Sequence, residues 1–189
     1  RRCIGAVWGS LPRLVGRCSV RCRTRDGREM PAERLRLAAY AVCLSDDQML
    51  LARYVSPDGD RRHWTLPGGM VEHGEDPFDA VVREVAEETG YDVDVERLLG
   101  VDSRHRHVQW GGPDGLDLHS VGVYYLARVV GGELRHETNG STDQAAWFPV
   151  AEVPDLERAV IVDVAMELER ARPAHGHVEP RSVDGLRRH

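Results

Sequence analysis

One stretch of 23 residues, from 69 to 91, constrains this chain more than any other part of it, and reads GMVEHGEDPFDAVVREVAEETGY. Glu87 and Glu88 follow Glu84 by three and four residues, so the three carboxylates share one face of a helix. Like charges at this spacing destabilise a helix by a few tenths of a kcal/mol per pair. A hard divalent cation, which prefers oxygen ligands, is the natural counter-charge, so the stretch predicts a metal site.

The same stretch predicts its own local structure. Asp76 can cap a helix whose first residue is Pro77, because proline lacks an N–H that the first turn would leave unpaired. Gly90 can adopt the left-handed conformation that ends a helix. We therefore expect a loop at residues 68–76 and a helix at residues 77–89. The apolar stripe expected to face a sheet consists of Phe78, Val81, Val82 and Val85.

The spacing of this stretch resembles the signature of the Nudix hydrolases, G-x5-E-x7-R-E-U-x-E-E-x-G-U, in which U is a bulky apolar residue. The matching residues are Gly69, Glu75, Arg83, Glu84, Val85, Glu87, Glu88, Gly90 and Tyr91. Specified identities at fixed gaps make the signature far more specific than a lone glycine-rich loop, and an exposed acidic helix is the competing interpretation. The resemblance implies a Nudix-like α/β/α sandwich with a mixed β-sheet between helices.

The resemblance also implies a metal centre that holds Mg²⁺ or Mn²⁺ as the cofactor. Its expected ligands are Glu84 and Glu88, with Glu87 close behind. Glu75 is expected to bind metal through water or to orient an arginine of the box. Glycine lets the main chain approach an ion closely, so the carbonyl of Gly68 or Gly69 is a further candidate ligand.

The reaction implied by the resemblance is hydrolysis of a pyrophosphate bond in a nucleoside diphosphate-linked substrate. Arg83 is expected to orient the glutamates by bidentate pairing. The general base is left open between a box glutamate and an acid from a later loop, where Asp143 is the best candidate and an ordinary turn residue is its competing interpretation. The expected catalytic residues are thus Glu84, Glu87, Arg83 and Asp143.

Candidate substrate-binding residues lie outside the box. Tyr54 and Trp110 could stack on a base, and Arg104 and His107 could contact phosphate, although a solvated strand face is the competing interpretation for the last two. Nucleoside triphosphates, ADP-ribose and nucleotide sugars remain open as substrates. A catalytically silent Nudix-like nucleotide-binding regulatory module is the alternative function; such a module would be expected to lose box carboxylates, and this chain keeps them all.

Composition narrows the class of protein. Residues 1–29 hold 8 of the 25 basic and 2 of the 31 acidic residues, which leaves the rest with 17 basic and 29 acidic residues. That acidic body argues against nucleic acid as a partner, and no apolar run of about 18 residues predicts a membrane span. Every basic residue is arginine, so lysine chemistry is excluded. The arginine bias indicates a GC-rich, bacterial genome, and the cysteine usage favours a cytoplasmic location. A homodimer remains open.

The chain divides into three parts on the sequence alone. Residues 1–29 are expected to be a disordered arm or extension, residues 30–172 the Nudix hydrolase domain, and residues 173–189 a disordered tail. Alternation and turn signals place strands at residues 35–44, 49–54, 119–130 and 145–150, and either one long strand or a pair of strands at residues 91–106. Spacing of apolar residues places an amphipathic helix at residues 156–172.

Overall fold

The fold comes from a computed structural model that describes residues 32–108, 115–138, 140–179 and 186–187. Two helices and nine strands form within these residues, together with one short 3-10 helix. The strands are β1 (Ala32–Ser45), β2 (Gln48–Val55), β3 (Arg62–Thr65), β4 (Gly68–Met70), β5 (Tyr91–Val108), β6 (Leu116–Gly132), β7 (Thr142–Pro149), β8 (Arg158–Ala159) and β9 (Leu186–Arg187). The helices are α1 (Pro77–Thr89), η1 (Val153–Asp155) and α2 (Val160–Ala171).

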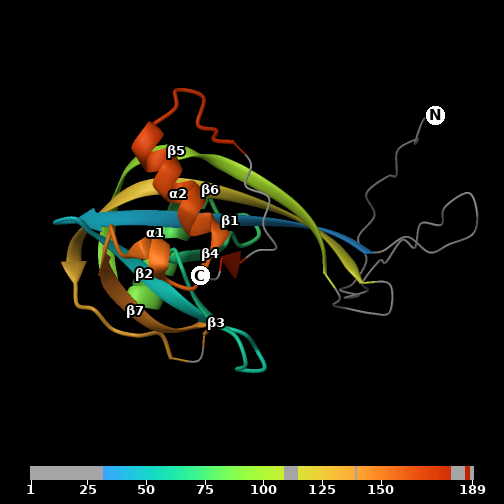
Figure 1. Cartoon of the computed structure of the whole chain (residues 1–189), viewed down its shortest axis with the longest axis horizontal. Helices are drawn as coiled ribbons and strands as arrows, with labels where there is room; N and C mark the ends of the chain where they lie inside the picture. The colour runs from blue at the N-terminus through green and yellow to red at the C-terminus, as the bar shows by residue number, and fades with distance from the viewer. Residues whose placement is uncertain (1–31, 109–114, 139, 180–185, 188–189) are drawn as a thin grey trace, which may run out of the picture.

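The strands join in one mixed sheet in the order β5-β6-β1-β2-β3-β8-β9, while β4 pairs with β1 and β7 pairs with β2. β5 and β6 form a long antiparallel hairpin, and β6 lies parallel to β1 along most of its length. Figure 1 shows these three strands running together beyond the helices, as an extension of the sheet. In the extension, paired residues of β1, β6 and β5 therefore lie side by side across the sheet, although β1 is far from the other two strands in the sequence.

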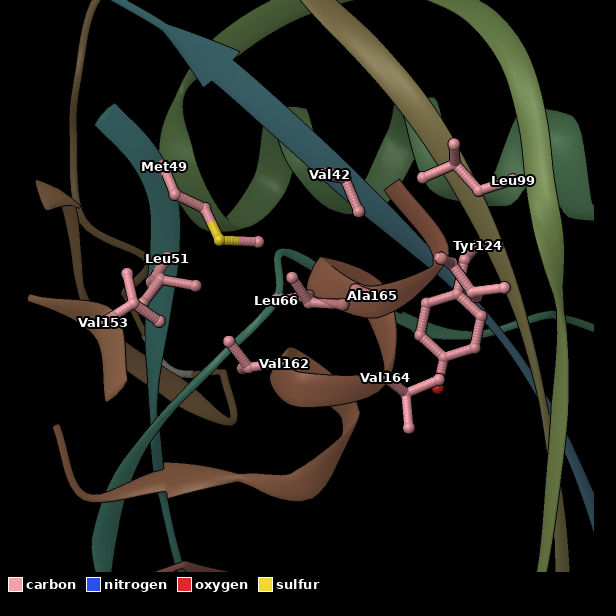
Figure 2. Packing of buried hydrophobic residues seen from close by; sticks show 11 residues of the cluster. Val42, Met49, Leu51, Leu66, Leu99, Tyr124, Val153, Val162, Val164 and Ala165 are labelled. Carbon is pink, nitrogen blue, oxygen red and sulfur yellow. The ribbon is translucent and has the colours of Figure 1, made fainter. Parts of the chain in front are cut away.

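Each face of the sheet carries one helix, because neighbouring residues of a strand point to opposite faces. On one face, Val42 of β1 packs with Val162 and Leu168 of α2 in a core cluster that Figure 2 shows. On the other face, Ala41 packs with Val85 of α1 in a second cluster. The two clusters make an α/β/α sandwich with a mixed sheet, and this prediction from the sequence is confirmed.

Most expected strands form at the expected places, but the last helix begins later than residue 156. α2 begins at Val160, and the residues before it extend along β3. The backbone N–H of Trp64 donates to the carbonyl of Glu157 at 2.8 Å, and Arg158 pairs with Trp64 in the ladder. Helical spacing could not reveal this pairing, because the partner strand lies about 90 residues earlier in the chain.

The folded unit also continues past residue 172, where the sequence placed the end of the domain. The backbone N–H of Val101 in β5 donates to the carbonyl of Gly176 at 3.0 Å. Val178 packs against the core cluster of α2. Leu186 and Arg187 pair with β8. The expected N-terminal arm, residues 1–29, lies outside the described residues.

Candidate metal and pyrophosphate site

The helix of the box forms at the predicted residues, whereas the first three residues of the expected loop, Gly68–Met70, form strand β4. The N–H of Phe78 donates to the carboxylate of Asp76 at 2.8 Å, which caps the first turn of α1. Gly90 ends the helix with a φ of 75°. Val81 and Val85 are buried against the sheet, whereas Phe78 of the expected stripe is 47 % exposed and forms an edge-to-face contact with Tyr125. α1 is thus held at both ends by local chemistry.

Strand β4 brings the glycines of the box against two glutamates of α1. The N–H of Gly68 donates to Oε2 of Glu88 at 3.0 Å. A Cβ atom on Gly69 would lie 2.6 Å from the carboxylate of Glu84, so only glycine leaves room for that side chain. The main chain of β4 and the carboxylates of Glu84 and Glu88 therefore meet at one place.

Arg83 links the loop carboxylate to those of the helix. Its Nε and Nη2 donate to both oxygens of Glu75, at 2.8 and 2.9 Å. Its Nη1 donates to Glu84 at 3.0 Å and to Glu87 at 3.1 Å. Nη2 also reaches the carbonyl of Met70 at 3.2 Å. One guanidinium thus fixes three carboxylates, a geometry that suits an orienting residue.

The glutamates of the site differ sharply in environment. Burial above all, together with the nearby charges of Glu84, Glu137 and Glu87, raises the pKa of Glu88 to about 8. Burial also raises the pKa of Glu84. In contrast, hydrogen bonds from Arg83 lower the pKa of Glu75 to about 2. The inner pair is therefore poorly compensated, while the loop carboxylate is fully paired.

Glu137 is a site residue that the sequence reasoning missed. It lies in the loop between β6 and β7, and its charge raises the pKa of both Glu84 and Glu88. Its Oε2 accepts from the N–H of Thr142 at 3.1 Å and from the hydroxyl of Thr142 at 2.8 Å. An acid from a later loop was expected from the sequence. Glu137 precedes the strand that contains Trp147, and this location is the one sequence signal that could have made it a candidate.

Asp143 lies in a different setting from the turn that was expected. It falls inside β7 as the extra residue of a bulge, since Arg53 pairs with Gln144 and Tyr54 pairs with Thr142. Both of its oxygens accept from Arg53, at 2.8 and 3.0 Å, and Arg62 lies 3.5 Å away. The hydrogen bond from Arg53 lowers the pKa of Asp143. The carboxylate is thus engaged by arginine.

The expected substrate-binding residues do not gather at one place. Arg104 lies on the α2 face of the sheet, where it pairs with Asp102 at 2.8 Å. His107 points to the opposite face and lies 2.7 Å from Asp117. Tyr54 packs against the ring of His63 at a centroid distance of 4.9 Å. Trp110 lies outside the described residues.

The donor set fits a hard divalent cation. Glu84 and Glu88 offer partly desolvated carboxylates, Glu137 adds negative charge, and Gly69 leaves space that a Cβ would fill. Across the described part of the chain, no three histidine, cysteine or acidic side chains stand together as a metal-binding group. Arg83 instead lies among them, where it contacts Glu84 and Glu87.

Comparison with known proteins places this geometry in a family. The fold and the box define a protein of the α/β/α class with a carboxylate-rich helix. The NUDIX domain family matches residues 34–166, which is more than half of the chain. The chain therefore belongs to the Nudix family.

Individual relatives support the same assignment. The 8-oxo-dGDP phosphatase NUDT18 of Homo sapiens is 34% identical over 145 residues, covering 73% of this chain and 41% of that protein. An ADP-ribose pyrophosphatase of Methanocaldococcus jannaschii is 38% identical over 93 residues, 49% of this chain and 50% of that protein. A NUDIX hydrolase structure from Nitrosomonas europaea superposes with a TM-score of 0.61 at 25% identity, covering 76% and 93% of the two chains.

The extent of these matches is partial. The chain spans half or less of the length of the two curated relatives named above. No helix within the described ranges is long and apolar enough to cross a bilayer.

Proposed function

We propose that the chain hydrolyses a pyrophosphate bond in a nucleoside diphosphate-linked substrate, with Mg²⁺ or Mn²⁺ held by Glu84, Glu88 and the main chain of β4. The observation that carries the proposal is the meeting of Gly68 and Gly69 with the buried carboxylate of Glu88 and the partly buried one of Glu84, inside a complete box. A divalent cation there would polarise the phosphate oxygens and offset charge that builds in the transition state.

The residues of the chain then divide into three roles. Glu84 and Glu88 bind the cation, and Glu87, more than half exposed, faces the solvent side of the same group. Arg83 keeps Glu84 and Glu87 oriented through its bidentate contact with Glu75. Glycine at position 69 keeps the approach to Glu84 open.

Glu137 is the general base that the geometry favours over Asp143. Its Oε2 is fixed by the two donors of Thr142, and its charge influences Glu84 and Glu88. Asp143 has both oxygens bonded to Arg53, and a carboxylate so paired is a poor proton acceptor. In the proposed reaction, water attacks phosphorus, Glu137 takes the water proton, and the phosphate leaves with the electrons of the broken P–O bond.

Nucleoside triphosphates, ADP-ribose and nucleotide sugars are the candidate substrate classes. The name of one relative, an ADP-ribose pyrophosphatase, points to the second of these classes. The name of another, an 8-oxo-dGDP phosphatase, adds an oxidised nucleoside diphosphate as a further candidate. The alternative function is a nucleotide-binding module without turnover. The retention of every box carboxylate favours the enzyme, since a binding module has no need of a charged, desolvated pair such as Glu84 and Glu88.

A nucleotide panel distinguishes these functions. Purified protein is incubated with Mg²⁺ and each nucleotide, and the products are identified by mass. We expect a nucleoside monophosphate or pyrophosphate from at least one class, with loss of turnover in Glu88→Gln. Arg128→Gln serves as the matched control, because Arg128 is exposed and its ion pairs join it to the surface carboxylates of Asp94 and Glu96. Binding without hydrolysis in the wild type would establish the module instead.

A further inference from the structure

A row of two arginines crosses the sheet extension on the face that carries α2. Arg36 of β1 pairs with Ser120 of β6, and Ser120 pairs with Arg104 of β5. Neighbouring strands lie about 4.8 Å apart, so the Cα atoms of the two arginines are about 10 Å from one another. Residues paired across a sheet point to the same face, and both guanidinium groups therefore stand above Ser120.

The guanidinium of Arg36 is incompletely satisfied. Its Nε atom is buried and has no hydrogen-bond partner among the described residues. A buried donor without a partner costs free energy, and such groups in a folded protein call for an explanation such as a bound ligand. Arg104 differs, because its Nε donates to the buried carboxylate of Asp102 at 2.8 Å. That contact holds Arg104 in place beside the unsatisfied Arg36.

Two tyrosines connect this row to the box carboxylates. Tyr40 stands four residues after Arg36 on the same face of β1, and its ring stacks on that of Tyr124 at 5.6 Å. Tyr40 pairs in the ladder with Gly68, whose N–H binds Glu88. The Cα atoms of Arg36 and Tyr40 are about 13 Å apart at the usual strand rise. Tyr40 thus neighbours both groups: the arginine row lies farther along β1, and the carboxylate of Glu88 lies across the ladder at Gly68.

Further positive charge surrounds the row. Arg34 and Arg106 are paired with Leu118, two positions farther along the extension, and both are exposed. Four arginines of the three strands therefore lie on this face, where Arg104 pairs with the buried Asp102, in an otherwise acidic protein. Such a local patch attracts a small anion, whereas the acidic body opposes a long polyanion.

We propose that Arg36 and Arg104 bind an anionic group of the substrate, a phosphate or carboxylate remote from the pyrophosphate that is hydrolysed. The inference rests on the proposed function and narrows its substrate class to nucleoside diphosphate derivatives that carry such a group on a ribose or on the linked moiety. The substrate passes over Tyr40, with its pyrophosphate at Glu84 and Glu88 and its second anion at the arginines. Arginine suits this role because its planar fork matches phosphate and carboxylate oxygens.

Matched substrate pairs test the proposal. The pairs are NADH with NADPH, 3′-dephospho-coenzyme A with coenzyme A, and UDP-glucose with UDP-glucuronate, each differing by one anionic group. We expect kcat/KM for the charged member of at least one pair to exceed that of its partner about tenfold or more, the scale of a charge-assisted hydrogen bond. Arg36→Met should abolish that preference. The kcat/KM for the member without the extra anionic group should stay within about threefold of the wild-type value. Arg36→Lys should retain part of it.

The controls separate this inference from the proposed function. Arg36→Met removes an unsatisfied buried donor, so the variant should fold with unchanged or higher stability. Arg128→Gln, at the other end of β6, should leave every preference unchanged. Two results overturn the arginine site: hydrolysis of only the members that lack the extra anionic group, or a preference that survives Arg36→Met. If no pair is hydrolysed while another nucleotide of the panel is, the arginine site is overturned and the proposed function stands. If nothing in the panel is hydrolysed, the proposed function fails, and calorimetric binding of the same pairs decides the site: equal affinity for both members overturns it.

Discussion

Glu88 is the residue on which the proposed chemistry depends most. Glu88 is 4 % exposed, and the backbone N–H of Gly68 donates a hydrogen bond that partly offsets the charge of its carboxylate. Burial raises the pKa of this carboxyl to about 8. A carboxylate in such a place is destabilised until a cation joins it, so binding of metal and stability of the fold are linked through this group.

The first prediction is a fall in the stability of the metal-free protein as pH rises. Between about pH 4.5 and pH 8, the folded state retains a proton on Glu88 that the unfolded state has lost, so the unfolding free energy decreases. The expected loss is on the order of a few kcal/mol. Urea denaturation in EDTA at pH 5 and pH 8.5 measures it. Mg²⁺ should restore stability at the higher pH, and a flat profile in EDTA would contradict the assignment.

The second prediction concerns the ligands of the cation. Glu84→Gln and Glu88→Gln should each lower turnover by about 10²-fold or more, because each removes a charge that stabilises the transition state. Glu88→Gln should also flatten the pH dependence of stability, since it removes the titrating group. Steady-state kinetics and Mn²⁺ titration measure both effects. Near-normal rates in two folded variants would exclude the pair as ligands.

The third prediction separates the two candidate bases. Glu137→Gln should lower kcat by about 10²- to 10⁴-fold, the usual effect of losing a general base. Asp143→Asn should keep kcat within about threefold, because its carboxylate is bound by Arg53 rather than aimed at the box. Asp143→Asn should still weaken the contact between β7 and β2. The opposite ranking of the two rates would return the base to Asp143.

The grouping of the box side chains was predictable, because the spacing along one helix fixes it. Glu84, Glu87 and Glu88 lie on a helix whose register is local, so their grouping with Arg83 follows from the chain itself. Glu137 was not predictable in this way, because its approach depends on the path of the loop between β6 and β7. Arg36 was missed for a similar reason: its partner in the row, Arg104, lies in another strand.

At the scale of elements, α1 and β4 act as one unit. α1 begins and ends at the predicted residues, because Asp76 and Gly90 cap it through contacts within the stretch. The residues of β4 were expected to form a loop. Their pairing with β1 joins segments far apart in the chain, so the residues around β4 cannot specify it by themselves. The start of β7 at Thr142 was missed as well, since the hydrogen bonds to Glu137 and the pairing with Tyr54 set it.

The fourth prediction tests this unit with two substitutions. Gly69→Ala should displace the carboxylate of Glu84, which would lie 2.6 Å from the new methyl group, and turnover and metal affinity should fall strongly. Asp76→Ala should instead cost about 1 kcal/mol of stability through loss of the helix cap, with turnover nearly unchanged below the melting range. Thermal unfolding and kinetics on both variants measure the contrast. Equal losses of turnover in the two variants would contradict the separate roles of Asp76 in capping α1 and of Gly69 in leaving space for Glu84.

At the scale of the whole molecule, the two faces of the sheet carry different groups of the candidate site. α1 and its cluster hold the carboxylates, while α2 and its cluster support the face where Tyr40 and Arg36 lie. The general architecture was predictable, because alternating strands between two amphipathic helices have few ways to bury both apolar sides. The share of the chain that belongs to the fold was harder to predict, since Pro, Gly and His after residue 172 have the composition of a tail.

The last prediction compares the two ends of the chain. Deletion of residues 1–29 should change the unfolding free energy by less than about 0.5 kcal/mol, because β1 begins at Ala32 and the family match begins at residue 34. Deletion of residues 173–189 should cost about 2 kcal/mol or more. It removes the hydrogen bond between Val101 and Gly176, the packing of Val178 and the pairing of β9 with β8.

Urea denaturation of the two truncated proteins and the full chain at one pH, with saturating Mg²⁺, measures the difference. Val178→Ala in the full chain is the matched control, since it removes only the packing of that side chain against the α2 cluster. Its cost should be a fraction of the cost of the C-terminal deletion, because the backbone contacts of Gly176 and β9 remain. Equal stability of the full chain and the protein ending at residue 172 would limit the fold to the domain that the sequence predicts, and a large loss on removing residues 1–29 would extend it in the other direction.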